Sequence, residues 1–127
     1  MRRTLIIALL VLAVSLAACL AGAGYVGRSV AEADGLRAQA ERAMSLGDVD
    51  GAAQAIQMMG ERWRARERVL ELMTSHDALA DVRGAVGDAL ICLNNGDAGE
   101  CLRALSSAGV ALERIRAAEA VRLANLY

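Results

Sequence analysis

The sequence predicts an all-α protein, in which an N-terminal transmembrane helix is followed by an antiparallel helical bundle of two helix-turn-helix hairpins. Proline is absent from the 127 residues, and Ala, Leu and Arg, which favour helix strongly, dominate the composition. From residue 28 onward, apolar residues recur every three or four positions, the period of an amphipathic helix. Ahead of that point lies one long uncharged run, typical of a membrane span.

The N-terminal run has the length and flanking charge of a signal-anchor. Arg2 and Arg3 precede an uncharged segment from Thr4 to Gly27. As a helix this segment would be about 36 Å long, against about 30 Å of hydrocarbon in a bilayer. Positive charge ahead of a span keeps the N-terminus in the cytoplasm. We therefore expect a single-pass anchor in the cell membrane over residues 1–27 and an extracytoplasmic four-helix domain over residues 28–127.

A second interpretation of the same run stays open. Leu16–Cys19 matches the lipobox of bacterial lipoproteins, which are cut before the cysteine. Cys19 would then carry the lipid and become the anchor. The residues after it, Leu20–Gly27, stay apolar where a lipoprotein usually continues into a polar tether, and this favours the uncleaved signal-anchor. Both interpretations place the domain outside the cytoplasm.

Charge argues against one class of partner. All fourteen basic residues are arginine, and after the first two are set aside, twelve remain in the domain against fifteen Asp and Glu. A protein that binds nucleic acid needs a basic excess on one face. We therefore expect no nucleic-acid partner.

Helix-breaking and capping residues divide the domain into four helical segments. Gly47 can supply a left-handed C-cap, and Asp48 or Asp50 can cap the next helix. Ser75 or Asp77 can cap a third helix. These positions predict the turn of the first hairpin and the start of the second hairpin.

A strong turn at Asn94–Asp97 begins the fourth segment and shows an internal repeat. Its Gly-Asp pair aligns with the Gly47-Asp48 pair at an offset of 49 residues, so that each half reads helix, turn, helix. The aligned pairs are Ala52 with Cys101, Ala53 with Leu102 and Ile56 with Leu105.

The second segment carries the clearest apolar face, with Trp63 at its middle and Arg66 as its one polar break. Trp63 is either the largest core residue or, if exposed, part of an interaction surface. Around it, the charged stretch Glu61–Arg68 is expected to be a solvated face whose charges pair three residues apart along the helix.

These features together resemble a known family. The matching positions are the basic and then apolar start, the Gly47-Asp48 turn flanked by Ala, Trp63, His76, and the closing Glu119, Asn125, Leu126 and Tyr127. Over essentially the whole chain, this pattern resembles bacterial domain of unknown function family 4363, which consists of small membrane-anchored helical proteins. The resemblance implies the same architecture and no activity, because the family has none established.

His76, the single histidine, is the candidate centre of a ligand or metal site. A histidine needs partners to act as a base or a metal ligand, and Asp77 and Asp81 would complete only a weak oxygen-rich site. We expect His76 to lie at a helix junction and to hydrogen-bond a terminal carbonyl. No metal and no other cofactor is expected.

Cys92 and Cys101 flank the third turn almost symmetrically, on consecutive antiparallel segments. Two cysteines placed in this way can face each other across a hairpin, and disulfides persist outside the cytoplasm. The pair is therefore a candidate disulfide. The alternative is two small core residues with free thiols.

No catalytic motif can be identified in the chain, and we expect that it is not an enzyme. The leading hypothesis is a non-catalytic interaction or structural module at the cell envelope, with Trp63 and His76 as candidate surface residues. Its partner would be another envelope protein or a second copy, since Ala18 and Gly22 have the spacing with which two membrane helices approach closely. The alternative is a ligand- or metal-binding accessory domain centred on His76.

Overall fold

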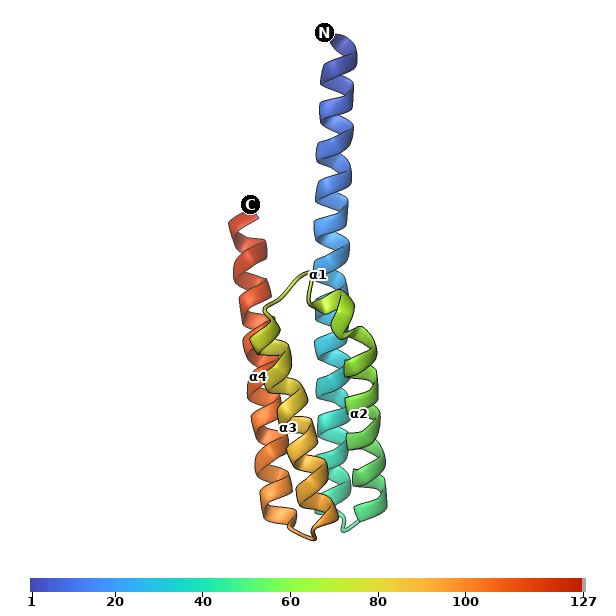
Figure 1. Cartoon of the computed structure of the whole chain (residues 1–127), viewed down its shortest axis with the longest axis vertical. Coiled ribbons are helices and arrows are strands. Elements are labelled where there is room, and N and C mark those ends of the chain that lie inside the picture. The colour runs from blue at the N-terminus through green and yellow to red at the C-terminus, as the bar shows by residue number, and fades with distance from the viewer. Residues whose placement is uncertain (127) are drawn as a thin grey trace.

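The computed structural model describes residues 1–126, so Tyr127, one of the residues that carry the family resemblance, lies outside it. Within this range the protein is all-helical, as predicted, with helices α1 (Arg2–Ser45), α2 (Val49–Leu70), α3 (His76–Asn94) and α4 (Ala98–Leu126). Successive helices run antiparallel, and each packs against two neighbours in the ring α1, α2, α3, α4 (Figure 1). The expected bundle of two hairpins is confirmed.

The two hairpins turn in the same way, which confirms the structural repeat. Gly47 and Gly96 have φ angles of 75° and 77°, a region that glycine adopts without strain. The aspartate that follows each glycine accepts a hydrogen bond from the N–H three residues later, at 2.9 Å for Asp48 and 3.1 Å for Asp97. Ser75 caps α3 in the same manner, at 3.2 Å. Each hairpin end is therefore fixed by local hydrogen bonds.

Two of the three aligned pairs also share their environment, whereas Ala53 is half-buried and Leu102 is exposed. Ala52 and Cys101 are both fully buried, and so are Ile56 and Leu105. The core continues along all four helices toward the other end of the bundle. Its largest fully buried apolar side chains are Trp63, Ile56, Met59, Leu70, Leu79, Leu105, Leu112 and Ile115.

Helix α1 passes the expected domain boundary at residues 27 and 28, and Gly35 beyond it, without a break. Its N-terminal part, residues 2–21, is exposed along its whole length and extends beyond the bundle (Figure 1). The helix is long and apolar enough to cross a membrane. Burial begins at Gly22, so the packed domain takes in the last residues of the apolar run.

Gly22 is where α1 enters the bundle, and the packing there leaves no room for a side chain. A Cβ at this position would lie 2.9 Å from Sδ and Cε of Met73, in the turn between α2 and α3. Contacts this short are well inside van der Waals distance, so a larger residue would force the end of the Met73 side chain to move. The face expected at Ala18 and Gly22 is thus covered at Gly22 by the chain's own Met73.

Arg66 interrupts the apolar face of α2, and contacts with α1 explain how the interruption is accommodated. Its guanidinium donates hydrogen bonds to Glu32 Oε2 at 2.7 Å and to Ser29 Oγ at 3.2 Å. It also lies over the ring of Tyr25, 5.8 Å from the centroid. Buried Ser29 in turn donates to the Tyr25 carbonyl oxygen at 2.8 Å. We call Tyr25, Ser29, Glu32 and Arg66 the polar joint.

We expect Arg66→Ala to lower the free energy of unfolding by about 1–3 kcal/mol, because Glu32 and Ser29 lose a charged donor. Arg68→Ala removes an exposed arginine two residues further along α2, and should change this free energy by less than about 0.5 kcal/mol. Urea unfolding of the full chain in detergent micelles, followed by circular dichroism, measures both. Equal effects of the two substitutions would contradict a stabilising role for the polar joint.

Candidate functional site

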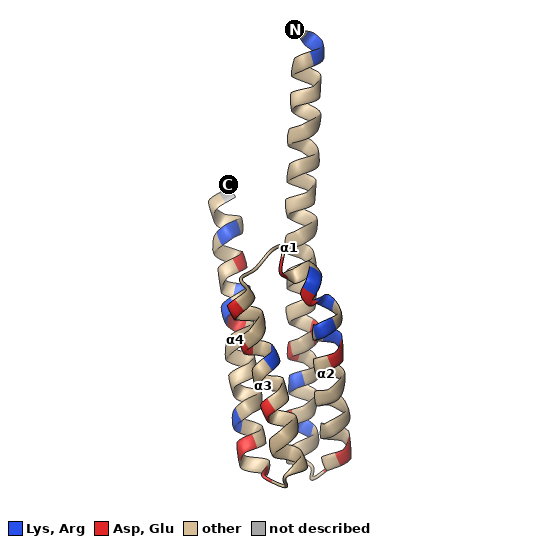
Figure 2. Ribbon diagram, viewed as in Figure 1, with Lys and Arg blue, Asp and Glu red and all other residues tan. Residues whose placement is uncertain are grey.

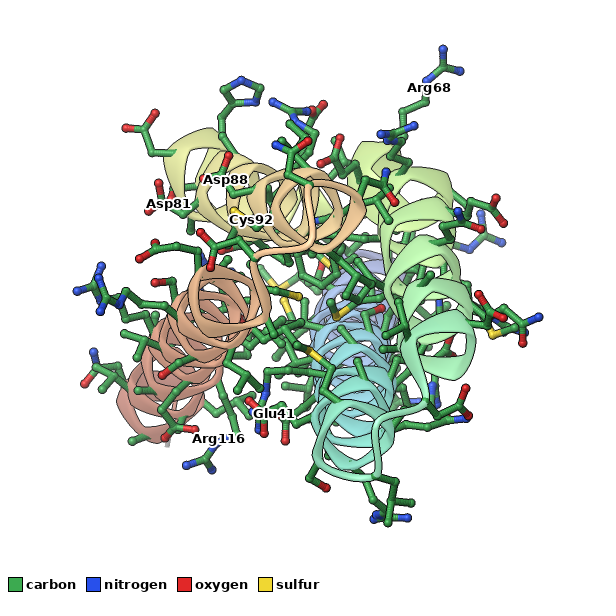
Figure 3. The ribbon with its side chains drawn as sticks, turned by 90° about the horizontal axis from the view of Figure 1, so that it is seen from below. Glu41, Arg68, Asp81, Asp88, Cys92 and Arg116 are labelled. Atoms are coloured by element: carbon green, nitrogen blue, oxygen red, sulfur yellow. The ribbon has the colours of Figure 1, made fainter. Side chains whose placement is uncertain are left out.

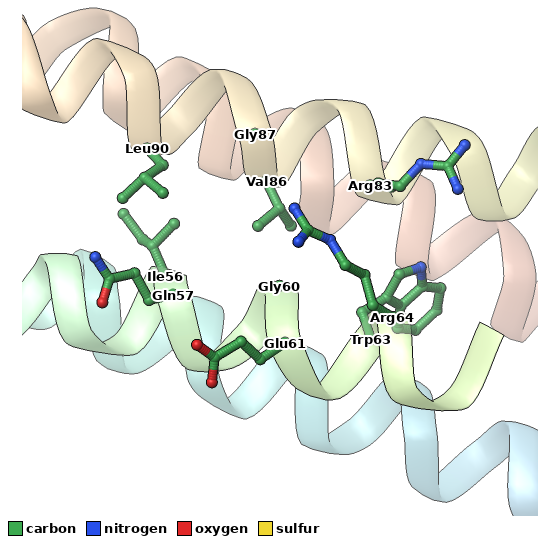
Figure 4. A pocket seen from close by; sticks show the side chains of 10 residues that line it. All are labelled: Ile56, Gln57, Gly60, Glu61, Trp63, Arg64, Arg83, Val86, Gly87 and Leu90. Carbon is green, nitrogen blue, oxygen red and sulfur yellow. The ribbon is translucent and has the colours of Figure 1, made fainter.

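A cleft of about 150 Å³ lies between α2 and α3 (Figure 4). Trp63 and the apolar side chains Ile56, Val86 and Leu90 line it. Two glycines, Gly60 on α2 and Gly87 on α3, also line it. A Cβ at Gly87 would meet no atom within 4 Å, whereas a Cβ at Gly60 would lie 3.3 Å from Cγ1 of Val86. This combination of an apolar lining and missing side chains makes a depression that an apolar group of a partner can enter.

The remaining lining residues of the cleft are polar. They are Gln57, Glu61, Arg64 and Arg83. Arg83 Nη1 donates to Glu67 Oε2 at 3.0 Å, which joins α3 to α2 beside the cleft. The other carboxylate oxygen of Glu67, Oε1, is buried and has no hydrogen-bond partner among the described residues. Apolar and charged groups therefore lie next to each other, as at many protein–protein interfaces.

Trp63 is not a surface residue, which corrects one of the two candidate surface positions. It is 2% exposed, and its Nε1–H donates to the carbonyl oxygen of Leu79 at 3.4 Å. Its ring packs in the core and reaches the cleft only as part of the lining. The apolar period of α2 is compatible with a tryptophan in the core or on the surface. In the structure α2 is rotated so that Trp63 faces α3, and the residue is therefore buried.

His76 begins α3 and is exposed, with 69% of its side chain accessible to solvent. Its Nδ1 lies 3.5 Å from Glu71 Oε1 across the α2–α3 turn. The expected partner, a terminal carbonyl, is thus replaced by a carboxylate. Across residues 1–126, no three His, Cys, Asp or Glu side chains come together in a way that could hold a metal ion.

The charged stretch Glu61–Arg68 pairs with other helices, where pairing along α2 itself was expected. Arg62 and Arg66 both reach Glu32 on α1, at 3.2 and 2.7 Å. Glu67 reaches α3, as described above. Figure 2 shows these charges gathered on the part of α2 nearest the projecting half of α1. These three ion pairs link helices, whereas Arg64 and Arg68 have no ion pair among the described residues.

Cys92 and Cys101 lie on α3 and α4 at either side of the third turn, and both are free thiols in this structure. Figure 3 views the bundle along its length and shows Cys92 on the side of α3 that meets α4. Cys92 is half-buried and Cys101 fully buried. Burial raises the pKa of both thiols, and the carboxylates of Asp97 and Glu100 raise that of Cys92 further. The disulfide stays a prediction.

Sequence reasoning did not single out Gly60, Gly87 or Arg83. The usable signal was the two glycines themselves, since glycine inside a helical pattern is unfavourable and often marks a close approach or a depression. The ion pair between Glu67 and Arg83 had no local signal in the sequence, because the two residues belong to different helices.

The raised pKa values predict slow reaction of both thiols in the folded protein. In a Cys19→Ser chain, we expect alkylation by iodoacetamide at about pH 8 to be at least about tenfold slower in the native state than in urea, because the thiolate is the reactive form. The alkylation rate of the native protein should rise with pH, and this rise should occur at a higher pH than in urea, since burial moves the pKa values of both thiols upward. Mass spectrometry counts the adducts.

The same experiment tests the candidate disulfide. A Cys92–Cys101 bridge would leave the unfolded chain unreactive until a reductant is added. Measurable alkylation that proceeds at the same rate in the native and unfolded states, with no reductant, would contradict the burial of the thiols.

The chain matches no family model, no curated protein sequence and no solved structure. The resemblance to family 4363 stays a prediction based on the residues that carry it. The α2–α3 cleft is smaller but more enclosed than the other depressions found among the described residues.

Proposed function

We propose that this protein is a non-catalytic interaction module of the cell envelope, anchored in the cell membrane by the N-terminal half of α1. One observation supports this more than any other. A single unbroken helix provides both an exposed apolar segment of membrane-spanning length and one of the four helices of the bundle. A helix shared in this way would hold the bundle close to the bilayer in a defined orientation, as a docking module requires.

The proposed topology has the N-terminus in the cytoplasm and the bundle outside. Arg2 and Arg3 support this orientation, because basic residues flanking a span are retained on the cytoplasmic side. The apolar segment between them and the bundle contains no charged residue. A lipoprotein anchored through Cys19 is the alternative, and it would place the bundle on the same side of the membrane.

The two forms of anchor predict different sizes for the Cys19→Ser chain. If α1 stays uncleaved, the substitution leaves electrophoretic mobility unchanged, because nothing is removed or attached at position 19. The matched control is Cys92→Ser, which replaces a cysteine outside the apolar segment. A slower-migrating precursor that appears only with Cys19→Ser would refute the signal-anchor and support lipidation.

The α2–α3 cleft is the proposed contact surface for a partner in the envelope, either another protein or a second copy. Its apolar lining can receive an apolar side chain, and its charged residues can select the partner's orientation. A Cβ at Gly87 would meet no atom within 4 Å, so a side chain at this position can begin without a clash and would enter the cleft.

We therefore expect Gly87→Leu to block the partner while preserving the bundle. A photoreactive residue at Gln57, which lines the cleft, should form a crosslink in native membranes. Gly87→Leu should reduce this crosslink by at least about tenfold, as expected when a central contact is lost. Both the yield and the mass of the crosslinked species are read from gels and by mass spectrometry.

Gly84→Leu is the matched control, because Gly84 lies one turn earlier on α3, outside the cleft, and a Cβ there would also meet no atom within 4 Å. Both substitutions should stabilise α3 by about 0.5–1 kcal/mol through helix propensity. The proposal fails if Gln57 yields only uncrosslinked monomer, or if the two leucines reduce the crosslink equally.

A further inference from the structure

The end of the bundle nearest the projecting half of α1 carries apolar side chains that the protein does not cover. Leu72, in the α2–α3 turn, is 83% exposed, and Val121, near the end of α4, is 61% exposed. We propose that this end of the bundle lies in the outer leaflet of the membrane that α1 crosses, with Leu72 and Val121 among the lipid headgroups and upper acyl chains. The inference rests on the proposed membrane anchor.

Exposure alone does not distinguish the two ends of the bundle, because Leu46, in the α1–α2 turn at the opposite end, is 78% exposed. The position of Leu72 along α1 distinguishes the two leucines. Its neighbour Met73 contacts Gly22, and Leu72 lines the same groove as Cys19 on α1. The α2–α3 turn is therefore level with residues 18–23 of the apolar run.

That level is the expected outer boundary of the hydrocarbon. A helix crosses about 30 Å of hydrocarbon in about 20 residues. Counted from Thr4, the first uncharged residue, a span of this length ends near Ala23. The α2–α3 turn thus lies where the hydrocarbon meets the headgroups, and the bundle has no room to stand away from the surface.

Helix α4 reaches the same level and continues past it. Leu123 and Arg122 line the groove that also holds Cys19 and Leu72. Because α4 runs antiparallel to α1, the residues after Leu123 extend toward the membrane side, beyond the α2–α3 turn (Figure 1). Residues 116–125 contain no fully buried side chain, so this end of α4 contributes little to the core.

The charged groups at this level suit an interface. Arg122 Nη1 donates to the carbonyl oxygen of Met73, and the guanidinium lies 3.6 Å from Glu119 Oε2. With 56% of its side chain exposed, Arg122 keeps donors free for lipid phosphates. Arg28, exposed on the first turns of α1 inside the bundle, lies just beyond the apolar run. Arginines at this depth can reach the headgroups with their long side chains.

Charge also separates the two ends of the bundle. The far end, residues 38–57 and 87–106, has two arginines against six acidic residues. The remainder of the bundle, from residue 22 onward, has ten arginines against nine acidic residues. An anionic membrane surface would repel the far end and tolerate the end that carries Leu72.

Tryptophan fluorescence in brominated lipid tests the inference with the full chain. Leu72→Trp and Leu46→Trp each add one tryptophan at an exposed turn, on opposite ends of the bundle, above the constant signal of Trp63. The chains are reconstituted in vesicles of equal parts phosphatidylcholine and phosphatidylglycerol, with bromine on the acyl carbons nearest the headgroup. Emission of the tryptophan added at position 72 should fall about twofold, because an interfacial indole lies beside the bromines.

Leu46→Trp should keep its full emission in the same vesicles, and Val121→Trp should be quenched as Leu72→Trp is. Equal emission of Leu72→Trp with and without bromine would overturn the inference. Flotation of each sample on a density gradient separates this failure from failure of the anchor. A chain that floats with the vesicles and is not quenched refutes only the contact, whereas a chain that does not float refutes the anchor on which the inference rests.

Discussion

One constraint organises the protein: a single helix, α1, must suit two environments along its length. Residues 2–21 are exposed, and from Thr4 onward they carry no charge, whereas residues from Gly22 onward pack against α2 and α4. An uninterrupted α-helix is stiff over this length, since without proline no backbone hydrogen bond is lost. The direction of the projecting segment therefore sets the direction of the whole bundle, and every later helix is placed relative to it.

The point of change along α1 is secured by two different kinds of contact. Gly22 allows Met73 to approach the backbone, which brings the α2–α3 turn against α1. One to three turns later, the polar joint ties α1 to α2 through Arg66. Its guanidinium donates to a carboxylate and a hydroxyl and lies over an aromatic ring, and these contacts offset the cost of placing a charge next to the core. Together these contacts resist bending between the projecting segment and the bundle.

The two hairpins of the repeat have the same turns but contribute side chains of different size to the core. Their Gly-Asp turns and small residues at Ala52 and Cys101 match. Further along, Met59 and Trp63 on α2 correspond to Ala108 and Leu112 on α4, and all four are buried. The larger side chains of α2 fill the centre, while smaller ones on α4 complement them. The two halves therefore bury the same positions but fill them with side chains of different size, and the resulting core is asymmetric.

The features predicted from sequence are those governed by neighbours along the chain. Helix period, the two caps and the glycine turns at Gly47 and Gly96 all arise from groups within about five residues of one another. For each cap the sequence left two candidates, and Asp48 and Ser75 are the ones that accept the hydrogen bond. Such interactions can be predicted from the sequence, because the geometry of the helix fixes the spacing of the residues that make them. The fold class and the positions of the hairpin turns followed from these signals.

Other features depend on how the helices are rotated and set against each other. Whether Trp63 is core or surface, which carboxylate Arg66 meets, and where α1 enters the bundle each required the packed structure. The cleft at Gly60 and Gly87 has the same origin, since it exists only because α2 and α3 lie opposite each other there. A helical period identifies one apolar face for each helix, but the residues that meet across two faces are set by long-range packing, which the local pattern does not encode.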